Sequence, residues 1–398
     1  MASPRSPTSR ARLPVAVIAL GLTSFFTDVA SDMIVPLLPA FLATLGASTA
    51  MLGLIEGAAE ATASFLKLGS GYVADRAPRK KPLVVVGYAI ATFARPLIAL
   101  AAIPAHVLAI RVVDRVGKGV RTAPRDAMIA AAAEPGEAGR AFGFHRAMDH
   151  AGAVVGPLVA TALIALGLTV RGVFAAALIP GVIALLCVLS VREPAPEAMP
   201  VAKGEAPTIA GPAVPRSLRG YLGILALFAL GNSSDAFLLL RAQDLGVPVA
   251  MIPVLWAVLH VSKVASTWIG GDLADRVPRP RLVAIGWIVY ALTYLALGVA
   301  TEAWQAWVIF VVYGAYHGLT EPAEKAMVKD LAPPSARGRA FGLYHFVIGV
   351  TAIPAGLLTG WIWEAFGPLH ALGLGALIAA ISGALLIAWD ARGGLVRA

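Results

Sequence analysis

Acidic residues at helical spacing interrupt the first two apolar stretches of the chain. Asp28 and Asp32 are four residues apart, and Glu56 and Glu60 repeat that spacing. Residues i and i+4 lie on the same face of a helix. Two carboxylates this close in a poorly hydrated site disfavour double ionisation, so one of them is expected to bind a proton. We expect Asp32, followed by Asp28, to carry the proton, with Glu56 and Glu60 as the rival pair.

Basic residues occupy one face of a later segment. Arg111, Arg115, Lys118, Thr122 and Arg125 follow one another at spacings of 4, 3, 4 and 3 residues. Such spacings keep side chains on one face of a helix. This basic stripe either binds an anionic substrate or pairs with the acids of the second apolar stretch and stabilises the fold. The sequence leaves both interpretations open.

The sequence lacks the common catalytic and metal-binding motifs. It contains no His-Glu-x-x-His and no Gly-x-Ser-x-Gly, which mark metalloproteases and hydrolases. One cysteine, Cys187, excludes an internal disulfide framework and a multi-cysteine metal cluster. Gly117-Lys118-Gly119 lacks the flanking residues of a phosphate-binding loop. We therefore expect no enzymatic activity, no cofactor and no metal.

The composition indicates that these charges lie inside a membrane protein. Of the 398 residues, 58% are apolar and 14% are charged, whereas soluble proteins have about 45–50% and about 25%. A helix that spans a bilayer needs about 20 mostly apolar residues. The sequence offers twelve such segments, at residues 14–45, 50–74, 82–103, 106–129, 140–166, 172–190, 220–240, 249–274, 282–300, 304–328, 340–360 and 369–389.

The basic residues are distributed unevenly between the turns. Twenty-four of the 32 Lys and Arg residues lie in the even-numbered turns and the two tails, whereas the opposite turns hold only Arg171 and Arg241. By the positive-inside rule, both termini are expected to be cytoplasmic. This topology accounts for the net charge of +9, so we expect no nucleic-acid partner. The predicted location is the inner (plasma) membrane.

The two halves of the sequence repeat each other. The motif Gly-Tyr-Val-Ala-Asp-Arg-Ala-Pro-Arg at 71–79 returns as Gly-Asp-Leu-Ala-Asp-Arg-Val-Pro-Arg at 271–279, 200 positions later. Gly-Arg-Ala-Phe-Gly at 139–143 recurs at 338–342. Repeated halves are typical of secondary transporters that bind substrate between them, near the midplane of the membrane.

These repeats predict the domain organisation. We expect an all-α integral membrane protein with twelve transmembrane helices, arranged as two six-helix pseudo-repeats around a central cavity. The N-terminal bundle would span residues 1–190 and the C-terminal bundle residues 220–398. Six prolines lie within residues 191–219, so we expect a cytoplasmic Pro-rich linker there.

The chain resembles the major facilitator superfamily over essentially its whole length. The loop that holds Gly71, Asp75, Arg76 and Arg79 is similar to that superfamily's signature loop, and its second copy contains Asp275 and Arg276. Glycine permits two helix ends to approach closely. A carboxylate at such a crossing can accept N–H groups at a neighbouring helix N-terminus. The resemblance implies that these residues form a conformational latch in an alternating-access cycle.

A second motif suggests the direction of transport. Gly152, Gly156 and Pro157 in the fifth segment resemble the superfamily's antiporter motif. The resemblance implies export coupled to an ion gradient.

The C-terminal half lacks a dense charge cluster of its own. At the offsets of the repeat, Glu56 and Glu60 correspond to Trp256 and His260, and Lys118 corresponds to His317. We therefore expect charge coupling in the N-terminal half and a substrate path along the C-terminal half. The expected substrate-binding residues are Arg111, Arg115, Lys118, Asp235, Trp256, His260, Tyr313, Tyr316, His317 and Glu321. The remaining histidines near turns, His106, His345 and His370, are expected to be solvated.

The sequence therefore predicts a secondary transporter rather than a membrane receptor or scaffold. The favoured function is proton-coupled export of a small molecule by a monomer in the lipid bilayer. The alternative is transport of an anionic metabolite, phosphorylated or carboxylated, by means of the basic stripe.

Overall fold

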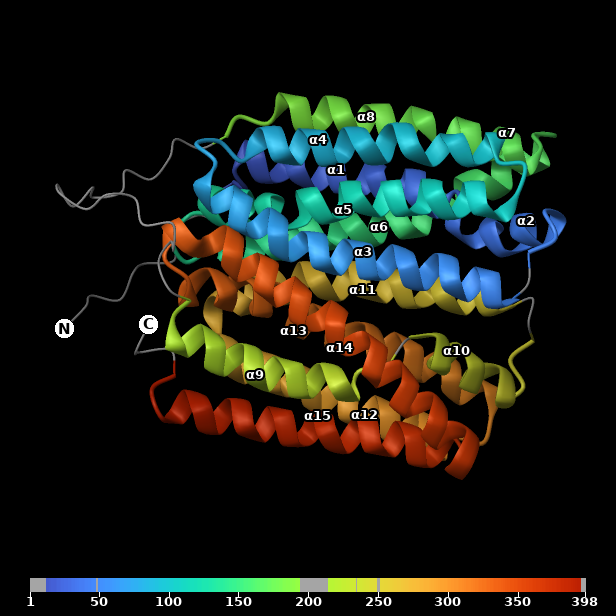
Figure 1. Ribbon diagram of the computed structural model, residues 1–398. Coiled ribbons are helices and arrows are strands. Elements are labelled where there is room, and N and C mark those ends of the chain that lie inside the picture. The colour runs from blue at the N-terminus through green and yellow to red at the C-terminus, as the bar shows by residue number, and fades with distance from the viewer. Residues whose placement is uncertain (1–11, 48, 194–213, 234, 249–250, 395–398) are drawn as a thin grey trace.

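The computed structural model describes residues 12–47, 49–193, 214–233, 235–248 and 251–394. Over these residues the chain forms helices joined by short turns, with no strand (Figure 1). The helices make twelve consecutive spans, which confirms the predicted all-α membrane fold.

Six spans form the N-terminal half. Long helices alternate in direction, and three of the spans include a short helical piece. Their bounds are α1 Val15–Asp32 with η1 Val35–Leu37 and α2 Leu38–Thr44, α3 Thr49–Arg76, α4 Lys81–Ala94 with η2 Arg95–Leu100, α5 Pro104–Ala132, α6 Ala138–Ala165, and α7 Val170–Ala176 with α8 Leu178–Ser190.

The other six spans form the C-terminal half. Their bounds are α9 Arg216–Gly231 with α10 Asp235–Asp244, α11 Ile252–Arg276, α12 Arg279–Val299, α13 Ala303–Leu331, η4 Pro334–Ala336 with α14 Arg337–Phe366, and α15 Pro368–Ala391. We call the end of the bundle where α1 begins and α15 ends the terminal face (Figure 1).

Four helices differ from the others in composition. Eight of the described spans are long and apolar enough to cross a membrane by length and composition alone. The other four, α3, α5, α11 and α13, are as long but carry more charge. They are the second and fourth spans of each half, so the repeat places the charged helices at equivalent positions.

The first and seventh spans are broken, whereas continuous segments were predicted there, at residues 14–45 and 220–240. α1 ends at Asp32, and Pro36 and Pro39 follow within the next turns. Proline lacks an N–H donor and disfavours the helical conformation of the residue before it. α9 ends at Gly231, and the chain turns at Asn232 before α10 begins at Asp235. Both breaks lie beside an acidic residue that the sequence had singled out.

The two halves meet along two helix pairs. α6 packs against α11, and α3 packs against α14. Glycines permit the close approach: a Cβ added at Gly71 would collide with the carbonyl oxygen of Gly338, and one at Gly143 would lie 2.6 Å from the Cα of Gly271. These crossings involve both copies of the repeated motifs.

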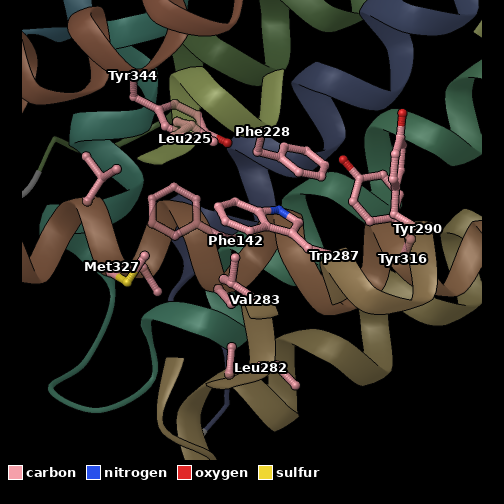
Figure 2. Close-up of a cluster of buried hydrophobic side chains, with 14 of the residues drawn as sticks. Phe142, Leu225, Phe228, Leu282, Val283, Trp287, Tyr290, Tyr316, Met327 and Tyr344 are labelled. Atoms are coloured by element: carbon pink, nitrogen blue, oxygen red, sulfur yellow. The ribbon is translucent and has the colours of Figure 1, made fainter. Parts of the chain in front are cut away.

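Aromatic side chains fill the core of the C-terminal half (Figure 2). Phe228 stacks on Trp287, with ring centroids 4.5 Å apart. Tyr290 contacts the same Phe228 ring edge-on at 5.2 Å. The cluster also includes Phe142 of α6, so it continues into the N-terminal half.

Candidate functional site

A polar cavity of about 280 Å³ lies between the two halves. Side chains from α1, α3, α5 and α6 line it on one side, and side chains from α13 and α14 line it on the other. Its charged lining comprises six basic residues (Lys67, Lys118, Arg121, Arg125, Arg146 and Lys325) and three acidic residues (Asp28, Asp149 and Glu321). An excess of one charge sign in a low-dielectric cleft concentrates ions of the opposite sign. The cavity is therefore suited to an anion.

A bidentate ion pair joins the halves at this cavity. Arg146 of α6 donates to both carboxylate oxygens of Glu321 of α13, each over 2.6 Å. The same guanidinium donates to Asp149 over 2.7 Å, and the Ser24 hydroxyl donates to that carboxylate from α1. Charge-assisted bidentate pairs of this kind are among the stronger polar contacts in proteins. The pair therefore fixes α6 relative to α13.

A second polar group joins the halves closer to the terminal face. Asp126 of α5 is fully buried and lies 3.0 Å from the ammonium of Lys325 and 2.7 Å from Nε2 of His345. Arg125 also contacts Asp126, over 3.0 Å. Asp126 and Lys325 are 199 positions apart, the offset of the repeat, so equivalent residues of the two halves pair with each other.

The prediction that His345 is solvated is wrong. α14 begins at Arg337, which places His345 more than two turns inside the helix. Its side chain is 15% exposed and contacts Asp126. His106 and His370 are exposed, as expected.

The first acid pair lies where two helices cross closely. A Cβ at Gly152 would lie 2.9 Å from Cβ of Asp28, and one at Gly156 would lie 2.9 Å from Cβ of Asp32. The glycines of the antiporter-like motif therefore bring α6 against the acidic face of α1. Asp28 lines the cavity, whereas Asp32 is not part of its lining. Among the described residues, neither carboxylate has a hydrogen bond or ion pair.

The rival acid pair lies on α3. Glu60 is 3.6 Å from the ammonium of Lys67, within the same helix, and its side chain is 49% exposed. The side chain of Glu56 lies outside the described part of the structure. The Glu60 carboxylate also interacts electrostatically with Lys118 and Arg115 of the basic stripe.

The basic stripe divides into two parts. Lys118, Thr122 and Arg125 line the cavity. Arg111 instead lies 3.8 Å from Asp114, which Arg95 contacts over 2.7 Å. Arg115 is not part of the cavity lining. Within the described residues, no hydrogen bond or ion pair engages the ammonium group of Lys118.

Most of the predicted residues of the C-terminal half are not part of the lining of this cavity. Asp235 accepts a hydrogen bond from the Tyr313 hydroxyl over 2.8 Å and lies 3.3 Å from the ammonium of Lys263. His260 packs on Trp256, and His317 packs on Tyr316, in both cases with ring centroids 4.6 Å apart. Of the predicted residues in this half, Glu321 alone lines the cavity.

The two repeated loops make equivalent contacts at the terminal face. Asp75 accepts hydrogen bonds from the backbone N–H groups of Gly338 and Arg339 over 2.7 and 3.0 Å, at the start of α14. Asp275 accepts bonds from Gly139 and Arg140 over 2.7 and 2.8 Å, at the start of α6. Each carboxylate binds the N-terminus of a helix in the other half, where the helix dipole favours an anion.

The arginines of these loops take different positions. Arg279 contacts Asp275 over 3.4 Å, whereas its counterpart Arg79 is exposed, as are Arg76 and Arg276. The carboxylates rather than the exposed arginines therefore make the contacts between the halves. Both loops are therefore engaged across the two halves at the terminal face.

A bundle of two six-helix repeats with a charged cavity between them is typical of secondary transporters. The Major Facilitator Superfamily model matches residues 20–262 and 221–396. The chain belongs to this superfamily, whose members are membrane transporters and not enzymes.

Individual relatives agree with this assignment. The chain is 31% identical over 379 residues to an uncharacterized MFS-type transporter of Methanocaldococcus jannaschii, covering 93% of this chain and 94% of that protein. Its fold matches the human organic anion transporter MFSD10 with a TM-score of 0.79 at 14% identity, covering 94% of this chain and 99% of the other. It matches the Escherichia coli fucose:proton symporter FucP with a TM-score of 0.75 at 13% identity, covering 93% and 97%. These structures show the shared fold. The protein is therefore a multi-pass membrane transporter of a small molecule.

Proposed function

We propose that this protein is a proton-coupled transporter of a small anionic molecule, such as a phosphorylated or carboxylated metabolite. The observation that carries the proposal is the cavity lining, in which six basic side chains face three acidic ones. Lys118 is the cation best placed for a substrate, since its ammonium group lines the cavity and makes no hydrogen bond or ion pair with the described residues. An ammonium group offers three N–H donors to a carboxylate or phosphate.

We propose Asp28 as the first candidate for proton coupling and Asp32 as the second. Asp28 shares the cavity with Lys118, so its negative charge opposes the binding of an anion nearby. A proton on Asp28 removes that repulsion, and the proton and the anion are then expected to bind together. Glu60 is a weaker candidate because it pairs with Lys67 and its side chain is about half exposed.

Export remains the second candidate for the direction of transport. It rests on the resemblance of Gly152, Gly156 and Pro157 to the antiporter motif. In an antiporter the proton and the substrate compete for the site, so anion binding would release protons instead of taking them up. The two mechanisms can be separated by measuring the pH of a weakly buffered solution of the purified protein when an anion is added. Uptake of protons would indicate that the proton and the anion bind together, and release of protons would indicate that they compete.

The topology and domain boundaries are proposed on sequence grounds. We place the terminal face in the cytoplasm, because most of the basic turn residues lie there. The bundles at residues 1–190 and 220–398 would move as two units within a monomer. Of the linker at 191–219, residues 194–213 lie outside the described part of the chain.

A thermal-shift experiment tests the substrate class. The purified full-length chain would be titrated with inorganic phosphate, short carboxylates, sugar phosphates and lipophilic cations. We expect stabilisation by at least one anion, loss of that stabilisation in Lys118→Gln, and retention in Lys80→Gln, which removes a lysine outside the cavity. Stabilisation by the cations alone would refute an anionic substrate.

A further inference from the structure

Glu324 of α13 is a buried carboxylic acid whose hydrogen-bond partners are neutral. Glu324 is 5% exposed. Trp287 donates its Nε1–H to Oε1 over 3.3 Å, and the Tyr344 hydroxyl lies 2.8 Å from Oε2. Over the described residues, no Lys, Arg or His lies within ion-pair distance of this carboxyl group.

The two side chains that hydrogen-bond to Glu324, Trp287 and Tyr344, belong to the buried aromatic cluster (Figure 2). The ammonium group of Lys325 forms an ion pair with Asp126 over 3.0 Å. Glu321, one turn earlier, is negatively charged in its pair with Arg146. The titratable or charged groups that face Glu324 are Tyr221 of α9, Tyr316, Glu321 and Lys325 of α13, and Tyr344 of α14.

At the equivalent position in the N-terminal half, the buried charge has a partner of opposite sign. Glu324 and Lys325 lie 199 positions after Arg125 and Asp126, so each charge sign is inverted between the halves. Arg125 and Asp126 contact each other over 3.0 Å. Asp126 also pairs with Lys325, which leaves Glu324 without a counter-ion. A buried unpaired carboxylate is unfavourable, and such a group generally binds a proton instead.

Tyr344 connects this acid to the central cavity. The residue lines the cavity and hydrogen-bonds to Glu324. A hydroxyl group can donate one hydrogen bond while accepting another. Tyr344 can therefore take a proton from cavity water and give its own proton to the Glu324 carboxylate, and the reverse transfer releases it.

We propose that Glu324 is a second proton-binding site of this transporter, loaded from the central cavity through the Tyr344 hydroxyl. The proposal rests on the proton coupling proposed above, but it concerns a different acid on the other half of the molecule. Lys325 and Glu321 flank this acid, and both have partners in the N-terminal half. Separation of the halves would free the Lys325 ammonium beside Glu324 and favour release of the proton.

Infrared difference spectroscopy of the substrate-free, full-length protein tests the proposal. Near neutral pH, we expect a carbonyl band of a protonated carboxylic acid that is lost in Glu324→Gln and retained in Glu364→Gln, which alters an exposed glutamate. Tyr344→Phe should shift the band, because the carboxyl group loses a hydrogen-bond partner. A spectrum without a Glu324-dependent band would overturn the proposal.

Isotope labelling of the wild-type protein provides a form of the infrared test that does not require the Glu324→Gln variant to fold. If Glu324→Gln does not fold, wild-type protein made with ¹³C-labelled glutamate should still show the band at a shifted frequency. An unshifted band would assign the proton to an aspartate and contradict the proposal. Because no substrate is added, the result stands even if the transported molecule is not an anion.

Discussion

Lys118 and Arg146 differ in how far their positive charges are already compensated. Arg146 forms a bidentate pair with Glu321 and also contacts Asp149. The Lys118 ammonium makes no hydrogen bond or ion pair with the described residues and lines the same cavity. A substrate anion therefore gains most from Lys118, whereas Arg146 contributes to the contact between the halves.

Neutralising Lys118 should weaken the binding of an anionic substrate. Hydrogen bonds to charged groups contribute about 1.5–3 kcal/mol, so Lys118→Gln is expected to raise Kd by roughly 10- to 150-fold. Calorimetric titration of the anion identified by thermal shift measures this change. If Lys118 serves only the acids of α3, the variant should instead lower the melting temperature, and exchanging the charges of Lys118 and Glu60 should partly restore it.

Removing one partner of the Arg146–Glu321 pair should destabilise this closed state. The side chains of this pair are only 20–23% exposed, so the charge that remains after one partner is removed is left partly buried, which is unfavourable. We expect Arg146→Gln and Glu321→Gln each to lower the melting temperature, and the double variant to lower it by less than the two separate losses combined. Strict additivity in this double-mutant cycle would show that the two residues are not coupled.

Asp28→Asn should separate substrate exchange from proton coupling. The amide can no longer bind and release a proton, but it leaves the positive charge of the cavity in place. Proteoliposomes with the variant should exchange labelled anion for unlabelled anion yet fail to accumulate it against a pH gradient. Asp32→Asn provides the comparison. If only Asp32→Asn uncouples transport, the coupling site lies at the break after α1 and not in the cavity.

At the terminal face, backbone N–H groups at two helix N-termini donate hydrogen bonds to the two repeated aspartates. Asp75 binds the N-terminus of α14, and Asp275 binds the N-terminus of α6. Both contacts must break for that face to open. Each aspartate therefore stabilises the closed state through backbone contacts that do not touch the cavity.

Asp75→Asn should alter the transport cycle without altering substrate affinity. The variant loses the charge that interacts with the helix N-terminus, so the closed terminal face becomes less populated. We expect a lower transport rate, an unchanged Kd for the anion and normal insertion in the membrane. Asp275→Asn should behave in the same way, and the exposed control Asp244→Asn should not. Wild-type turnover in both loop variants would refute a latch role.

The elements were predictable from the sequence because span length and charge position depend on local composition. The twelve spans and the repeated loops could be found without a structure. The breaks after Asp32 and at Asn232 were missed, although Pro36 and Pro39 were a local signal for the first of them. No motif in the sequence singled out Arg146, which lies eight residues into α6, about 12 Å from the helix start.

The partners across the cavity were not predictable in the same way. Helical spacing shows which residues share a face, but it does not show which helix that face meets. The pairing of Asp126 with Lys325 and His345 depends on three helices from both halves. The charges of the fourth and tenth spans were visible in the sequence, and their inversion across the repeat at positions 125–126 and 324–325 was an available signal.

In the whole molecule, the contacts between the halves form three successive layers from the terminal face to the cavity. The two aspartate latches lie at the face, the group around Asp126 lies deeper, and the Arg146–Glu321 pair borders the cavity. An alternating-access cycle must release all three layers to open this side. An anion that competes with Glu321 for Arg146 would weaken the innermost layer, which links substrate binding to opening.

The most direct test of proton-coupled anion transport is anion accumulation in proteoliposomes under an imposed pH gradient. The wild-type protein, reconstituted alone, would be supplied with the anion that stabilises it in the thermal-shift panel. We predict that the anion accumulates in the more alkaline compartment, because a proton and an anion move together, and that an uncoupler abolishes the effect. Anion flux that responds to neither orientation of the gradient, or accumulation of lipophilic cations with no anion transport, would contradict the account.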